Sequence, residues 1–262
     1  MELAGYLALV CVGIVLGITG GGGSILSVPI LVYLFSLDVV MASAYSLFIV
    51  GITSIVGTAL KQKDRLVDVR SGLIFAIPSI LAAFSTRKWV LPSIPDLVLQ
   101  IGTFNVNKRG LLLGILAVVI ILVSVRTILN GRARAKVTAP LKSYGLIPMG
   151  LVTGMLAGLL GVGGGFLILP TLVVFARIPF ESAVGTTLFV IALNSLLGFL
   201  GDLLNYTINW TFLLSVTALS IAGVYVGILS NKMVPVQPLE KSLGWITLGL
   251  GIWILVIEVL PG

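Results

Sequence analysis

The chain has 262 residues, of which 58% are hydrophobic and 10% are charged, whereas a soluble domain carries about 25% charged residues. With a mean hydropathy of +1.20, this composition excludes a soluble globular domain and predicts a multi-pass membrane protein. The net charge of +7 comes from basic residues in short loops between apolar runs, so it indicates a cytoplasmic-side charge bias and no nucleic-acid partner. A single cysteine and no histidine exclude internal disulfides, His-bound metals and His-dependent catalysis, so no cofactor, metal site or enzymatic activity is expected.

Ten apolar segments follow one another along the chain, and most approach the 20 or so residues that a spanning helix needs. Two of them are too short to cross a bilayer as straight helices, and each directly follows a glycine run. The polar stretch 92–107 lies between the fourth and fifth segments, and its path is not assigned. The ten segments are 3–18, 24–36, 38–60, 71–91, 110–130, 144–160, 165–176, 180–200, 210–231 and 242–260.

The two glycine runs belong to an internal duplication. GITGGGGSILSVP (17–29) aligns with GLLGVGGGFLILP (158–170) at a fixed offset of 141 positions, and the register continues without a gap. Between 17–57 and 158–198, 13 of 41 positions are identical, against about 4 expected by chance in so apolar a composition.

The duplication predicts the fold class. An odd number of crossings per copy makes the second copy enter the membrane from the opposite side, so the copies are inverted. We expect an all-α polytopic membrane protein of about ten transmembrane segments, as two inverted five-segment repeats, each with a glycine-rich broken or re-entrant helix. The first repeat is 1–130, a cytoplasmic linker is 131–143, and the second repeat is 144–262.

The loop charges predict the orientation. The loop after the third segment carries Lys61, Lys63, Arg65 and Arg70, whereas its counterpart 201–209 has no basic residue. The positive-inside rule puts this loop and the linker in the cytoplasm and both termini outside, in the cell inner membrane. Two further border charges have ordinary expectations: Arg87 reaches the headgroups, and Asp202 is a solvated loop charge.

The glycine runs are the first candidate site. An unwound stretch at membrane depth must line a cavity or be buried in protein, and the half-helix after it directs free N–H groups back toward the break, where an anion could bind. The alternative is that the glycines only allow close helix packing. The candidate binding residues are Gly20, Gly21, Gly22, Gly23 and Ser24 in the first copy and Gly161, Gly163, Gly164 and Gly165 in the second.

A polar stripe on the third and eighth segments is the second candidate. Ser46 and Thr53 lie on one helix face, and their repeat mates are Thr187 and Asn194, with Ser54 and Ser195 one step round. Such a stripe usually faces the bundle interior, where it could donate hydrogen bonds to an anion. The alternative is hydrogen bonding between helices.

The strings GLLGVGGGFLILPTLV (158–173) and AVGTTLFVIALNSLLG (183–198) resemble the TauE/SafE sulfite-exporter family, also called the 4-toluene sulfonate uptake permease (TSUP) superfamily. The resemblance covers nearly the whole chain. It implies a prokaryotic-type inner-membrane transporter of sulfite, sulfonates or other small anions, with the glycine breaks, Thr53 and Asn194 at the family's site positions.

Together these features predict a secondary transporter, an exporter of small sulfur-containing anions, that works by alternating access around a midplane site between the repeats. The alternatives are an anion channel and an importer of small carboxylates or thiosulfate. The expected partners are the small anion and membrane lipids, with a homodimer as an option.

Overall fold

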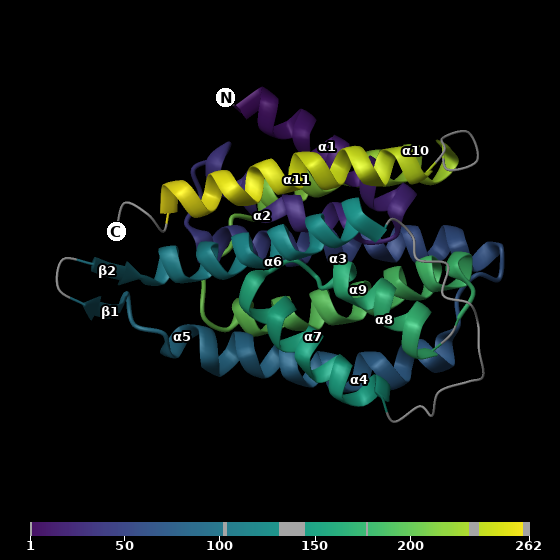
Figure 1. The fold of residues 1–262 in the computed structure, drawn as a ribbon, viewed down its shortest axis with the longest axis horizontal. Coiled ribbons are helices and arrows are strands. Elements are labelled where there is room, and N and C mark those ends of the chain that lie inside the picture. The colour runs from purple at the N-terminus through teal and green to yellow at the C-terminus, as the bar shows by residue number, and fades with distance from the viewer. Residues whose placement is uncertain (1, 102–103, 131–144, 177, 231–235, 259–262) are drawn as a thin grey trace.

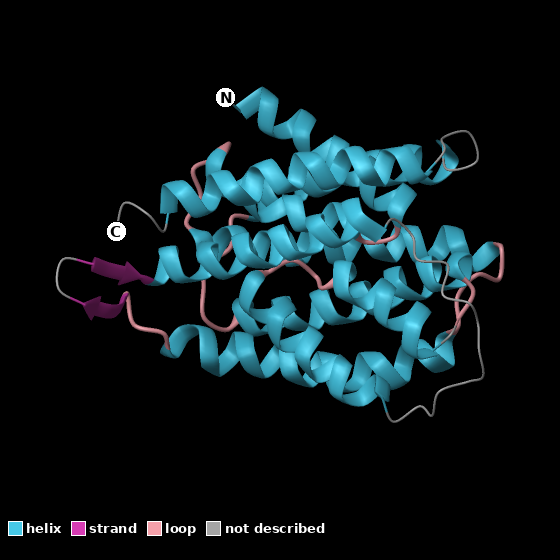
Figure 2. Cartoon of the chain, viewed as in Figure 1, coloured by secondary structure: helices cyan, strands magenta, loops and turns pink. Residues whose placement is uncertain are grey.

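The structure is a computed structural model, and it describes residues 2–101, 104–130, 145–176, 178–230 and 236–258. The described chain is helical almost throughout, with one pair of strands at one end (Figures 1 and 2). The linker expected at 131–143 lies outside the described residues. The elements are α1 (Glu2–Thr19), η1 (Gly22–Leu26), α2 (Ser27–Tyr33), α3 (Val39–Lys63), α4 (Val69–Ser85), η2 (Thr86–Val90), α5 (Leu91–Ser93), β1 (Leu97–Ile101), β2 (Phe104–Asn107), α6 (Lys108–Asn130), α7 (Leu146–Leu160), α8 (Gly165–Thr171), η4 (Leu172–Ala176), α9 (Phe180–Leu203), α10 (Trp210–Ser230) and α11 (Val236–Glu258).

Six helical stretches in the described chain are long and apolar enough to cross a membrane: α3, α4 with its extension to Ser93, α6, α9, α10 and α11. The expected multi-pass membrane protein is therefore confirmed. In α3 and α9, 72% of the most apolar 18-residue window is buried, against 39% or less in the other four. These two helices form the centre of the bundle, and Figure 1 shows them in the middle of the molecule.

The glycine breaks turn the chain back on itself. After α1 ends at Thr19, η1 and α2 run back along α1, so that the rings of Tyr6 and Phe35 stack edge-on with centroids 5.2 Å apart. Gly23 packs against the backbone of Leu16, where a Cβ would lie 2.8 Å from the amide nitrogen. After the second break, α8 and η4 likewise contact α7. We call α1 with η1–α2 the first broken pair and α7 with α8–η4 the second.

The expected ten transmembrane segments stay a prediction. Six of the ten apolar segments fall on the candidate spans, and the other four form the two broken pairs. The sequence left open whether the short segments span or are re-entrant. The contacts of these short segments with α1 and α7 favour a re-entrant arrangement, in which a short segment enters the membrane and returns to the same side.

The polar stretch 92–107 forms a β-hairpin, which the all-α expectation did not include. Strands β1 and β2 pair antiparallel, with Ile101 opposite Phe104. The corresponding connection in the second copy, 231–235, is only five residues long. The hairpin is therefore additional to what the two copies share, and 92–107 has no equivalent of the same length in the second copy.

The two copies make the same helix contacts. A Cβ at Gly17 of α1 would lie 2.6 Å from the carbonyl oxygen of Val224 in α10, and one at Gly158 of α7 would lie 2.9 Å from the carbonyl oxygen of Ala83 in α4. Gly17 and Gly158 are 141 positions apart, and so are Ala83 and Val224. The offset therefore extends beyond the aligned region 17–57, into α4 and α10.

Helices α3 and α9, which are mates in the duplication, run in opposite directions. Gly57 packs on Leu188 at 3.0 Å, and Gly198 packs on Leu47 at 3.5 Å, distances measured from an ideal Cβ on each glycine. The end of α3 therefore contacts the start of α9, and the end of α9 contacts the start of α3. Gly57 and Gly198 are repeat mates, and so are Leu47 and Leu188, so the two contacts are equivalent and the α3–α9 interface has two-fold symmetry.

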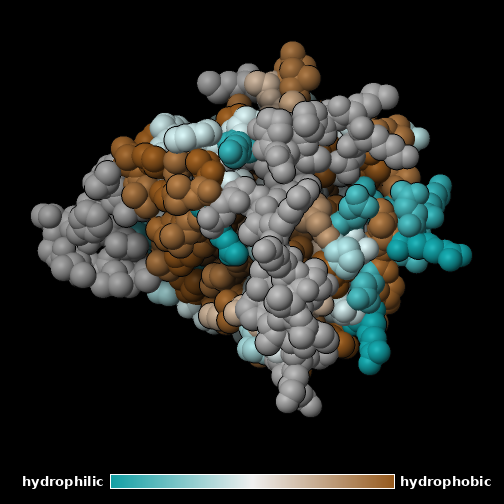
Figure 3. Space-filling model, turned by 45° about the vertical axis from the view of Figure 1, so that its right-hand side comes forward, coloured by the Kyte–Doolittle hydropathy of each residue, from teal (hydrophilic) through white to brown (hydrophobic). Residues whose placement is uncertain are grey.

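The surface separates into an apolar flank and a basic end. Lys63 at the end of α3, Arg65 in the turn that follows and Arg70 at the start of α4 are exposed. Figure 3 shows hydrophilic side chains gathered at one end, beside a flank that is mostly hydrophobic. We call this the basic-loop end, and the opposite end, which carries β1 and β2, the β-hairpin end (Figure 1).

Gly154→Ala is expected to lower the unfolding free energy by about 1–3 kcal/mol, because a methyl group there overpacks the α4–α7 contact. The new Cβ would lie 2.7 Å from the Cα of Ser79, a backbone atom that cannot move alone. Gly249→Ala is the matched control, since nothing lies within 4 Å of a Cβ there. Melting temperatures of the purified chain in detergent measure both, and equal values for the two variants would contradict the close contact.

Candidate functional site

The two glycine breaks meet at their tips. Five glycines in them have positive φ angles: 75° at Gly20, 153° at Gly21, 69° at Gly161, 69° at Gly163 and 75° at Gly164. The backbones touch between the breaks, because a Cβ on Gly165 would lie 2.8 Å from the Cα of Gly21. The expected interruption of both helices and their approach to each other are therefore present in the fold.

Each break also packs on the start of the central helix of the other copy. A Cβ at Gly20 would lie 2.5 Å from Cγ1 of Val184 in α9, and one at Gly161 would lie 2.5 Å from the Cα of Ser43 in α3. Ser43 and Val184 are repeat mates. The breaks are thus held between α3 and α9 by equivalent contacts, and only glycine fits both the φ angle and the space.

The first break satisfies much of its own hydrogen bonding. The Gly22 amide donates to Oγ1 of Thr19 at 3.1 Å, and the Ser24 hydroxyl donates to the carbonyl of Gly21 at 2.8 Å. The helical elements that follow the breaks are short, five residues in η1 and seven in α8. The helix-dipole part of the prediction stays a prediction, and the buried polar side chains nearby are the further candidates.

Four members of the predicted polar stripe are buried without a hydrogen-bond partner. The hydroxyls of Ser46, Thr187 and Ser195 are unpartnered, and so are both the amide oxygen and the amide nitrogen of Asn194. Each of these residues is at most 1% exposed. Thr53 differs, because its hydroxyl donates to the carbonyl of Ile49 at 2.7 Å. An amide in an apolar interior normally has hydrogen-bond partners. These unpartnered groups are therefore candidates for hydrogen bonds to a ligand.

The second break contacts the stripe directly. A Cβ at Gly163 would lie 2.8 Å from Oγ of Ser195 and 3.0 Å from Cγ1 of Val50, so this glycine sits between α9 and α3. The structure therefore brings the second break together with Ser195. Ser54, the repeat mate of Ser195 that the sequence places one step round from the stripe, also has a buried hydroxyl without a partner.

Arg87 and Asp202 correct two expectations. Arg87 does not reach the headgroups and Asp202 is not solvated: both are 0% exposed, and Nη1 of Arg87 lies 3.0 Å from Oδ2 of Asp202. The same Nη1 donates to Oγ of Ser43 at 2.9 Å. Just outside the span, burial and then the charge of Asp202 raise the pKa of the Tyr206 phenol. The buried pair therefore lies next to the contact between Ser43 and Gly161.

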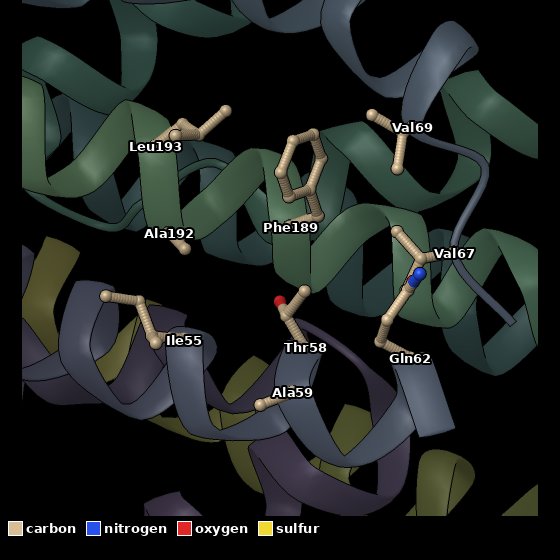
Figure 4. A pocket seen from close by; sticks show the side chains of 9 residues that line it. All are labelled: Ile55, Thr58, Ala59, Gln62, Val67, Val69, Phe189, Ala192 and Leu193. Carbon is tan, nitrogen blue, oxygen red and sulfur yellow. The ribbon is translucent and has the colours of Figure 1, made fainter. Parts of the chain in front are cut away.

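A cavity of about 370 Å³ lies between α3, the start of α4 and α9, near the basic-loop end. Figure 4 shows Ile55 and Thr58 of α3 across from Phe189 and Leu193 of α9. Its walls are apolar except for Thr58 and Gln62, so it offers little to bind an anion. Within the described ranges, no three His, Cys, Asp or Glu side chains group together to hold a metal ion.

Comparisons with known proteins point to one family. The model of the family described as sulfite exporter TauE/SafE matches residues 6–254. A "Probable membrane transporter protein" of Xylella fastidiosa is 28% identical over 252 residues, covering 93% of this chain and 91% of that protein. The "Probable membrane transporter protein YunE" of Bacillus subtilis is 26% identical over 260 residues, covering 87% of this chain and 89% of that protein. No solved structure matches the chain significantly.

These names agree with the sequence-based expectation of a membrane transporter and not an enzyme. The resemblance noted in the strings 158–173 and 183–198 is confirmed by the family model, which spans both copies of the duplication.

Proposed function

The chain belongs to the sulfite exporter TauE/SafE family, and on this premise we propose that it is a secondary transporter that exports small sulfur-containing anions such as sulfite or organosulfonates. The single observation that carries the proposal is the set of unpartnered buried groups on α3 and α9, led by Asn194. The support for this position is the packing of Gly163 on Ser195, at 2.8 Å from an ideal Cβ, and the place of α3 and α9 at the centre of the bundle. A hydroxyl or amide donor without a protein partner gains a hydrogen bond when an anion enters.

Alternating access between inverted repeats is the mechanism that we propose. Its support is the two-fold contact of the antiparallel mates α3 and α9, together with the equivalent packing of Gly20 on Val184 and Gly161 on Ser43. Each copy has three candidate spans, and this odd number supports an inverted second copy. Rocking one copy against the other around these contacts would expose the site to each side in turn.

The proposed orientation places the basic-loop end in the cytoplasm and the β-hairpin end outside, in the cell inner membrane. Lys63, Arg65 and Arg70 are exposed at the basic-loop end, and such clusters favour the cytoplasmic side. An anion in the cytoplasm would approach this positive end first.

The test is binding and transport by the purified chain. A thermal-shift screen with sulfite, thiosulfate, taurine, sulfoacetate and acetate is expected to show stabilisation by the sulfur oxyanions, because a ligand of the folded state raises the melting temperature. Counterflow of labelled sulfite in proteoliposomes is expected to show stimulation from the opposite side. Conductance without such stimulation would contradict a transporter and indicate a channel.

Asn194→Leu is expected to weaken sulfite binding by about 10–100-fold, since a hydrogen bond to a charged group contributes about 1.5–3 kcal/mol. The melting temperature without anion should stay equal or rise, because leucine has the same branched shape at Cγ and needs no hydrogen-bond partner. Asn205→Leu is the matched control: Asn205 is exposed and already donates to the Gly201 carbonyl at 3.1 Å. A fall in melting temperature with unchanged affinity would make Asn194 a structural residue.

A further inference from the structure

One of the three guanidinium nitrogens of Arg87 has hydrogen-bond partners, and the other two have none. Its Nη1 donates to Asp202 and to Ser43, while its Nε and Nη2 are buried and have no hydrogen-bond partner. Oδ1 of Asp202 is also buried and unpartnered. Arg87 lies in η2, a π-helical turn within the candidate span Val69–Ser93. Such turns are frequent at functional sites.

A second arginine–carboxylate pair at the β-hairpin end, Arg109 with Glu258, has the bidentate hydrogen bonds that the Arg87–Asp202 pair lacks. In Arg109, Nε donates to Oε2 of Glu258 at 3.1 Å and Nη2 donates to Oε1 at 2.8 Å. This bidentate geometry uses the planar edge of the guanidinium that matches two oxygens on one atom. At Arg87 the same edge is free, although Arg87 is 0% exposed and the Arg109 side chain is 48% exposed.

The buried pair is not required by the repeated architecture. The repeat mates of Arg87, Asp202 and Ser43 are Ile228, Lys61 and Val184. The equivalent place in the other copy therefore cannot form this ion pair. Because a buried ion pair adds little stability over apolar packing, its presence on one side only points to a role other than holding the fold together.

The pair lies close to the proposed anion site. Ser43, which accepts a hydrogen bond from Arg87, is the residue on which Gly161 of the second break packs. Asp202 comes from the second copy, whereas Arg87 and Ser43 come from the first. Releasing Asp202 from Arg87 would therefore loosen a link between the two copies at the β-hairpin end.

We propose that Arg87 binds the transported anion through its Nε and Nη2, and that Asp202 is the internal carboxylate that holds the guanidinium when no anion is bound. This inference rests on the proposed transport of anions. The ligand class is a small oxyanion with two oxygens on one atom, such as sulfite, a sulfonate or a carboxylate. A single-atom anion such as chloride offers one acceptor atom in place of two oxygens matched to the two N–H groups, so it binds more weakly.

The experiment compares Arg87→Lys, Asp202→Asn and the double variant with the unaltered chain, by titrating sulfite, methanesulfonate and chloride in thermal-shift and calorimetric assays. Arg87→Lys keeps the charge but loses the bidentate edge, so sulfite affinity should fall at least tenfold. Asp202→Asn removes the competing charge, so sulfite affinity and the sulfite-induced melting shift should both rise, and this gain should vanish in the double variant. Arg109→Lys is the matched control and should leave the affinity unchanged.

The outcomes separate this inference from the proposed function. If the unaltered chain binds sulfite and Arg87→Lys binds it equally well, Arg87 is not the anion-binding residue, while the transporter stands. If Arg87→Lys does not fold, Asp202→Asn decides, and an unchanged or lower sulfite affinity overturns the inference. If the unaltered chain neither binds nor transports any of these oxyanions, the proposed function and this inference fall together. Equal binding of chloride and sulfite overturns the bidentate role.

Discussion

Gly161→Ala is expected to abolish transport and to lower the unfolding free energy by about 2–4 kcal/mol. Gly161 ends α7 with a φ of 69°, a left-handed conformation that disfavours any residue with a Cβ. The new methyl group would also lie 2.5 Å from both the Cα and the carbonyl oxygen of Ser43. Since these are backbone atoms of α3, the second broken pair must move away from the central helix. Sulfite counterflow in proteoliposomes and melting in detergent measure the two effects.

The size of this effect should depend on what the methyl group meets. At Gly20 the φ angle is similar, 75°, but the nearest atom is Cγ1 of Val184, the end of a side chain. Gly20→Ala should therefore cost less than Gly161→Ala, and Gly249→Ala should cost nothing measurable. Equal losses at Gly20 and Gly161 would show that the contact with the Ser43 backbone is unimportant.

The duplication made the glycine breaks predictable. Each glycine costs about 1 kcal/mol in a helix interior, so a run repeated at a fixed offset signals a selected break. The same offset pairs Ala83 with Val224 and Ser43 with Val184, far from the glycine runs. Residues that the offset relates therefore make equivalent contacts in the fold.

The reversal of the chain at each break was not predictable from length. Helix α1 has 18 residues, close to the length of a span, and nothing local says whether the next segment continues or returns. The return is decided by tertiary packing, such as the stacking of Tyr6 on Phe35. The β-hairpin was missed for a related reason: a short polar stretch between apolar segments has no periodicity that distinguishes a strand pair from a loop.

The sequence predicted which residues form the polar stripe, but it did not predict which of them have hydrogen-bond partners. Thr53 and Asn194 are repeat mates, yet Thr53 bonds back to its own helix while Asn194 has no partner. A threonine hydroxyl reaches the carbonyl four residues earlier, whereas the longer amide of asparagine does so less readily. The duplicated positions therefore differ in how available they are to a ligand.

Arg87 and Asp202 were missed because their partnership is purely tertiary. Each stands near the end of an apolar segment, where a charge usually reaches the headgroups or water. They are 115 positions apart, and neither has an opposite charge nearby in sequence to indicate the pair. One local signal exists in hindsight: Gly201, next to Asp202, leaves the space that the Arg87 Cβ occupies, at 2.9 Å from an ideal Cβ.

Arg87→Met is expected to lower the unfolding free energy by about 3–5 kcal/mol, because it leaves the carboxylate of Asp202 buried without its counter-charge. The exposed counterpart gives the control: Arg109→Met breaks a pair whose arginine is 48% exposed, and such pairs contribute about 0–1 kcal/mol. Melting temperatures in detergent compare the two. A loss at Arg87 no larger than that at Arg109 would contradict the burial of the pair.

The double variant Arg87→Met/Asp202→Leu separates stability from anion binding. Replacing a buried ion pair by apolar residues of similar volume is often neutral or stabilising, so most of the stability lost in Arg87→Met should return. If the pair served only the fold, sulfite affinity would return with it. If Arg87 binds the oxyanion, the double variant should melt like the unaltered chain yet bind sulfite as weakly as Arg87→Lys. The two readings therefore predict the same melting temperature and opposite affinities.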